Sequence, residues 1–165
     1  MTENTGNIIE LPYQLINIDM GDEHFSLTFK KFAKEQSEYL LRHKCVTGDF
    51  EIEYNCSGIK SKFECDITIG SLFCFYIALD DAYDIQSCRD NTVSSGNFGN
   101  SSELMLRFDK GHYFFSGCCK NKNNGNKSAV SFDFEIQQAD IVEMLMSMDD
   151  FFCKIKKLQG NCDFI

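Results

Sequence analysis

The sequence predicts an α+β fold in which an antiparallel β-sheet, or a partly open β-sandwich, carries two main α-helices at about residues 66–83 and 138–155. Three observations support this class. The chain has 16 Phe and 6 Tyr, and aromatic residues favour strands. Several segments alternate apolar and polar residues, whereas two longer segments have the helical period. The length of 165 residues suits a single domain spanning the chain.

Strand patterns fill the first part of the chain. Strands are predicted at residues 8–18, 24–31, 39–45, 50–56 and 59–65. Pro12 limits the first of these to a sheet edge. A turn signal at residues 47–49 predicts a hairpin whose outer face carries Glu51 and Glu53. Residues 1–7 are polar and are expected to be disordered.

The helix at residues 66–83 should begin at an N-cap formed by Asp66 or Thr68. Its main apolar arc comprises Leu72, Phe75, Tyr76, Leu79 and Tyr83. Phe73 and Ile77 lie outside that arc, so this helix should be covered on more than one side.

The second part of the chain repeats the order of strands followed by a helix. Residues 84–102 are rich in Ser, Asn and Gly and predict a long loop. A three-stranded meander is expected at residues 103–109, 112–120 and 129–136. The closing helix at 138–155 has an apolar arc of Ile141, Met144, Leu145, Met148 and Phe152.

The two parts can be aligned without a gap at an offset of 69 residues, which places residues 63–83 on residues 132–152. Two explanations remain open: a degenerate strand-strand-strand-helix duplication, or the common periodicity of any strand-to-helix unit. Either explanation predicts the same architecture twice.

The sequence shows no catalytic motif, so we expect no enzyme activity and no cofactor or metal. His43 and Cys45 would share a strand face, but no C-x-x-C spacing accompanies them. The nine Cys are odd in number and follow no signal peptide, which predicts free thiols that fill the core in a cytoplasmic protein.

The net charge of −9 argues against a partner bound through phosphates, whether nucleic acid or an anionic membrane. A basic protein is the expected partner of a chain that is monomeric when free. Residues 128–153 hold six acids and no Lys or Arg. On the closing helix these acids surround an exposed Met146, as is typical of a protein interface. The candidate partner-binding residues are Asp140, Glu143, Met146, Asp150, Asp133, Glu135, Glu51, Glu53 and Phe98.

The segment GHYFFSGCC, followed by a loop and VSFDFEIQQADIVEMLMSMDDFF, resembles immunity proteins of bacterial polymorphic-toxin and contact-dependent growth-inhibition systems, especially those paired with wall-associated toxins. The resemblance is strongest over residues 103–155. It implies a small cytoplasmic toxin inhibitor that binds the C-terminal domain of one cognate toxin, often a basic nuclease, and occludes its active-site cleft.

Two other functions stay open on the sequence. One is an enzyme or small-ligand protein with a site between sheet and helices, built on His43 or a Cys. The other is a structural or regulatory interaction domain that has no toxin partner.

Overall fold

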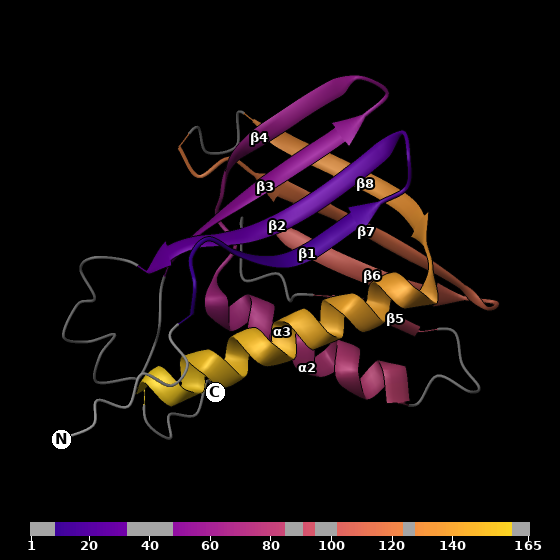
Figure 1. The fold of residues 1–165 in the computed structure, drawn as a ribbon. Coiled ribbons are helices and arrows are strands. Elements are labelled where there is room, and N and C mark those ends of the chain that lie inside the picture. The colour runs from indigo at the N-terminus through magenta and orange to yellow at the C-terminus, as the bar shows by residue number, and fades with distance from the viewer. Residues whose placement is uncertain (1–8, 33–47, 85–90, 95–101, 124–127, 160–165) are drawn as a thin grey trace, which may run out of the picture.

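The computed structural model describes residues 9–32, 48–84, 91–94, 102–123 and 128–159. It contains two four-stranded antiparallel sheets, each followed by a helix (Figure 1). The first sheet and its helix are β1 (Tyr13–Asp19), β2 (Glu23–Phe32), β3 (Gly48–Cys56), β4 (Ile59–Cys65) and α2 (Ile69–Asp84). The second set is β5 (Asn91–Ser94), β6 (Glu103–Asp109), β7 (His112–Lys120), β8 (Ala129–Ile136) and α3 (Gln138–Gln159).

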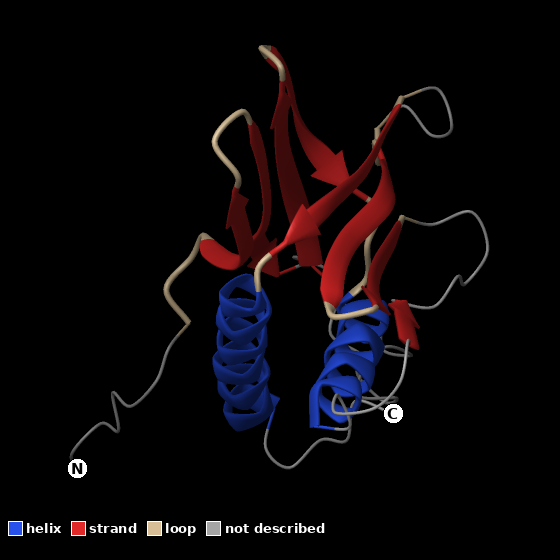
Figure 2. Cartoon of the chain, turned by 90° about the vertical axis from the view of Figure 1, so that its right-hand side faces the viewer, coloured by secondary structure: helices blue, strands red, loops and turns tan. Residues whose placement is uncertain are grey.

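The two sheets pack face to face, and both helices lie on one side of them (Figures 1 and 2). Aromatic rings join the inner faces: the Phe25 ring centroid on β2 lies 5.3 Å from that of Phe115 on β7 and 4.5 Å from that of Phe132 on β8. Helix α3 packs on β1, where the Tyr13 and Phe151 rings are 5.4 Å apart. The predicted α+β class is therefore confirmed, in its β-sandwich form.

The first sheet has an apolar inner face and a polar outer face. In the register of β2 and β3, Leu27 pairs with Ile52 and both are fully buried. The neighbouring pair, Thr28 and Glu51, points the other way, and both residues are partly exposed. This alternation is the period of two that the sequence shows in both strands.

The predicted hairpin between residues 39–45 and 50–56 is wrong at its turn. Gly48 and Asp49 belong to β3, and β3 pairs with β2. Gly48 fits here because a Cβ at this position would overlap the Phe29 ring of β2. Residues 39–45 lie outside the described residues.

The second sheet has four strands where three were predicted. Within the expected loop at residues 84–102, β5 pairs with β6, as Thr92 does with Arg107. The gap-free repeat at an offset of 69 residues fits the helix starts, since Ile69 and Gln138 are that far apart. Each half of the chain thus has four strands before its helix, where the predicted unit had three.

The expectation that the first helix is covered on more than one side is confirmed for Phe73, whose ring centroid lies 5.0 Å from that of Phe152 on α3, while α2 also lies against β5. It is wrong for Ile77. The main arc is buried as predicted, with Leu72, Phe75 and Leu79 fully covered. Cys74 is exposed and Ile77 is 41% exposed. One face of α2 therefore points to solvent.

A buried polar link joins the two halves of the chain. Ser102 is 1% exposed, and both its backbone N–H and its hydroxyl donate to the Asp66 carboxylate. The same hydroxyl accepts a hydrogen bond from the Lys120 backbone N–H at 2.8 Å. Ser102 thereby ties the segment before α2 to β7.

The six described cysteines are all free. Cys65 and Cys119 are buried, as expected for core residues, and burial raises the pKa of the Cys65 thiol to about 12. Cys74 and Cys153 are exposed, so the prediction that cysteines fill the core is wrong for these two. Neither helix in the described part of the chain has the length and apolarity needed to cross a membrane.

Candidate partner-binding surface

The solvent-facing side of α3 carries an apolar side chain among acids. Met146 is 68% exposed, and Glu143, Asp149 and Asp150 are exposed around it. These four residues are called the α3 patch. Residues three and four apart share a helix face, so Met146 lies beside all three carboxylates. The buried arc of α3 turns the patch away from the sheets because Ile141 and Met148 are fully covered.

Two tyrosines from other elements hold the aspartates of the α3 patch in place. The Tyr76 hydroxyl on α2 donates to Asp149 at 2.8 Å. The Tyr13 hydroxyl on β1 donates to Asp150 at 2.6 Å, and Lys154 also donates to Asp150 at 2.6 Å. Among the described residues no partner of Glu143 is found. Glu143 and Met146 are thus the members of the patch most available to another molecule.

The Tyr13 hydrogen bond has a measurable pH signature. Burial, and then the hydrogen bond to Asp150, raise the pKa of Tyr13 from 10.0 to about 12. Because the folded pKa is the higher one, the stabilisation from this phenol is complete below pH 10 and is lost as the pH rises toward 12. The pKa of Tyr54 is also raised to about 12, chiefly by burial, so the test compares variants. We expect ultraviolet titration of Asp150→Asn to show one of the tyrosines that titrate near pH 12 in the wild type moving to lower pH. An unchanged titration in this variant would contradict the contact.

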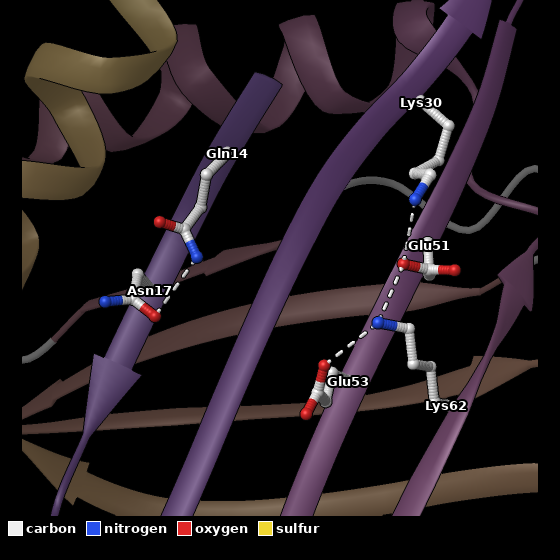
Figure 3. A network of polar contacts seen from close by, with 6 residues as sticks. All are labelled: Gln14, Asn17, Lys30, Glu51, Glu53 and Lys62. Atoms are coloured by element: carbon white, nitrogen blue, oxygen red, sulfur yellow. Dashed lines mark hydrogen bonds and ion pairs between the residues drawn. The ribbon is translucent and has the colours of Figure 1, made fainter. Parts of the chain in front are cut away.

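The acids predicted on the first sheet are already paired within the chain. Glu51 lies between Lys30 and Lys62, at 3.3 Å from each ammonium nitrogen. Glu53 lies 3.2 Å from Lys62 (Figure 3). Each carboxylate therefore has a local cation on the same outer face, and this face offers little net negative charge to a partner.

The remaining predicted residues are dispersed. Asp133 is exposed on β8, and the neighbouring Glu135 carboxylate lies 2.6 Å from Nδ1 of His112. Asp140 caps α3 by accepting a hydrogen bond from the Gln137 backbone N–H at 2.8 Å. Phe98 lies outside the described residues. Of the candidates, the structure brings Glu143, Met146 and Asp150 together.

Sequence reasoning missed Asp149 and the exposed face of α2. Asp149 was omitted although it lies three residues beyond Met146, a spacing that places both on one face. Ile77 was read as covered because an apolar residue in a largely apolar helix is usually buried. Asp80 and Asp81 lie one helical turn beyond Ile77 and share its face. These two charged residues were the signal in the sequence that this face of α2 is exposed.

The described residues offer little support for chemistry. Among them no group of three or more His, Cys, Asp or Glu could hold a metal ion. His43 and Cys45 lie outside the described part of the chain. Between the first sheet and the helices, Phe29 and Phe151 pack with ring centroids 5.1 Å apart, so aromatic side chains fill this part of the layer where a small-ligand site was considered.

Comparisons with known proteins find similarity at the level of solved structures. No protein-family model matches, and no curated protein sequence matches. WHY1 from Arabidopsis thaliana is 12% identical and has a TM-score of 0.41, over 93% of this chain and 94% of that chain. The plant transcriptional regulator PBF-2 is 11% identical, with a TM-score of 0.40 over 93% and 85%. WHY3 from Arabidopsis thaliana is 12% identical, with a TM-score of 0.36 over 93% and 92%.

These findings contradict the function that the immunity-protein resemblance implied. The three similar structures are named as WHY proteins and a plant transcriptional regulator, and none is named as an immunity protein or a toxin inhibitor. The predicted partners are contradicted as well. A cognate toxin and the exclusion of nucleic acid are withdrawn as expectations together with that function.

Proposed function

We propose that this protein is a non-catalytic binding protein that engages a positively charged segment of a protein partner through the α3 patch. The observation that carries the proposal is Met146, which is 68% exposed and ringed by carboxylates. A flexible thioether packs against varied apolar side chains, and the carboxylates favour Lys and Arg around that contact. Burial of Met146 would supply affinity, while the acids would supply orientation and a fast association rate.

The absence of catalysis is part of this proposal. The His112 imidazole and the Glu135 carboxylate form the closest acid–base pair of the described residues that involves a His, at 2.6 Å. Both side chains are at least half exposed, on the outer face of the second sheet. Water-excluded surroundings that would tune such a pair for proton transfer are lacking at this position. A reducing compartment such as the cytoplasm is proposed too, since free thiols at Cys74 and Cys153 are open to solvent.

The test is a titration of the protein into a fluorescent amphipathic peptide of lysine and leucine, with single-stranded oligothymidine as the nucleic-acid probe. We expect the peptide to bind at physiological salt, and more tightly than the oligonucleotide. Met146→Ser and Glu143→Gln should each weaken peptide binding at the α3 patch, with about a tenfold loss of affinity at that patch for Met146→Ser, equivalent to about 1.4 kcal/mol. Binding of the oligonucleotide in place of the peptide would overturn the proposal.

The matched control is Ile59→Ser. Ile59 is 72% exposed but lies at the start of β4, in the sheets rather than in the helical layer. This control therefore shows whether the loss of any exposed apolar side chain weakens peptide binding, or only the loss of one in the α3 patch. Equal affinity of wild type, Met146→Ser and Ile59→Ser for the peptide would show that the attraction is a general effect of negative charge.

A further inference from the structure

The repeat in this chain is closest along its two helices. Residues 72–82 of α2 and 141–151 of α3, which are 69 positions apart, have the same exposure class at every position. Each helix also follows a buried isoleucine, Ile67 and Ile136. The two helices thus present equivalent faces to the core and to solvent.

The helix starts are built in the same way. In α2, the Ser71 hydroxyl accepts a hydrogen bond from the Thr68 backbone N–H at 3.2 Å. In α3, the Asp140 carboxylate accepts one from the Gln137 backbone N–H at 2.8 Å. In each pair the two residues have the spacing of a capping box, and the second pair lies 69 positions after the first. The equivalence therefore extends from the cap through the body of each helix.

This equivalence includes the exposed apolar position. Ile77 of α2 corresponds to Met146 of α3, and both are large hydrophobic side chains open to solvent. The Asp80 and Asp81 pair follows Ile77 as Asp149 and Asp150 follow Met146. We propose that α2 carries a second copy of the partner-binding surface, the α2 patch of Ile77, Asp80 and Asp81, so that one chain binds two basic polypeptide segments. This inference rests on the proposed function of the α3 patch.

The kind of occupant follows from the charges. Asp80 and Asp81 are exposed near the carboxyl end of α2, which ends at Asp84. The helix dipole is negative at that end, so these carboxylates are placed where the helix itself disfavours them and a cation is attracted. Among the described residues neither aspartate has an ion pair or side-chain hydrogen bond. A Lys- or Arg-rich segment that contains an apolar residue such as leucine matches this surface. The apolar side chain of that segment would cover Ile77.

The two patches differ in two respects that matter for binding. Cys74 of α2 stands at the position of Glu143 in α3, so the α2 patch has two carboxylates and the α3 patch has three. Asp149 and Asp150 of α3 already accept hydrogen bonds from Tyr76 and Tyr13. The α2 aspartates accept none from the described side chains, so more of their charge is open to a partner. The two patches lie on helices that touch, because the Tyr76 hydroxyl of α2 is 2.8 Å from Asp149 of α3. A partner with two basic segments could therefore engage both.

Isothermal titration calorimetry of the full chain with a short lysine and leucine peptide tests this inference. Wild type should bind two peptides per chain, and Ile77→Ser or Asp80→Asn/Asp81→Asn should each leave one. Met146→Ser should also leave one, and Ile77→Ser/Met146→Ser none, while the control Ile59→Ser keeps two. One peptide per wild-type chain, with no effect of the α2 substitutions, would overturn the second site and leave the first. No binding by wild type would overturn the proposed function itself.

Discussion

Phe25→Ala is expected to lower the free energy of unfolding by about 3–5 kcal/mol. Phe25 is fully buried on β2, and its ring makes two of the aromatic contacts between the sheets. Phe115 and Phe132 touch it from the second sheet, so truncation leaves a cavity that neither rigid sheet can close. Urea denaturation followed by circular dichroism measures the loss. If the alanine variant is too unstable to purify, Phe25→Leu should also lower the free energy of unfolding, by a smaller amount.

The matched control for Phe25 is Phe114→Ala. Phe114 lies on β7 with its ring toward the outer face, where the Arg107 guanidinium carbon is 4.2 Å from the ring centroid. The Phe114 ring is only half-buried, and its loss removes this cation–π contact, worth about 0.5–1 kcal/mol, and a ring contact with His112, so the destabilisation should be smaller than for Phe25→Ala. Equal losses in the two variants would contradict the sandwich arrangement.

Gly117→Ala is expected to destabilise the fold by about 1–3 kcal/mol. Gly117 sits on β7 between Leu104 and Phe132 in the strand register. A Cβ here would lie 2.5 Å from the Glu103 carbonyl oxygen and 2.8 Å from the Phe132 ring. The carbonyl belongs to the backbone of β6, so it cannot move aside without disturbing the sheet.

Gly70→Ala serves as the control for Gly117→Ala, because the same chemical change should act in the opposite direction. Gly70 lies in the first turn of α2, and a Cβ there would meet nothing within 4 Å. Alanine in a helix is favoured over glycine by about 0.5–1 kcal/mol, so this variant should be stabilised. Thermal unfolding of both variants checks the pair. Equal stability of Gly117→Ala and wild type would show that β6 and β7 are not packed as described.

Periodicity predicted the elements whose side chains are divided between core and solvent. The alternation in β2 and the apolar arc of α3 are of this kind, because burial of one face is written directly into the residue order. The exposure of Met146 among acids could be predicted for the same reason, once the arc of α3 was located.

Elements defined by backbone pairing could not be predicted in this way. Strand β5 lies in a segment rich in Ser, Asn and Gly, and its identity depends on pairing with β6. Gly48 resembles a turn residue, yet it lies in β3. A glycine is needed there because the Phe29 ring occupies the space that a Cβ would fill. The pairing of Glu51 with Lys62 likewise depends on strand register, which brings β3 and β4 together.

The central claim is that the helical layer is the binding surface for a basic polypeptide. Two-dimensional amide NMR spectra of the isotope-labelled full chain, recorded during titration with the unlabelled lysine and leucine peptide, test it most directly. We expect the largest shift changes at Glu143, Met146 and Asp149 of α3 and at Ile77 and Asp80 of α2. The outer face of the first sheet, where Glu51 and Glu53 are paired with lysines, should stay unchanged (Figure 3). Shift changes confined to the sheets, or changes produced by oligothymidine and not by the peptide, would contradict the claim.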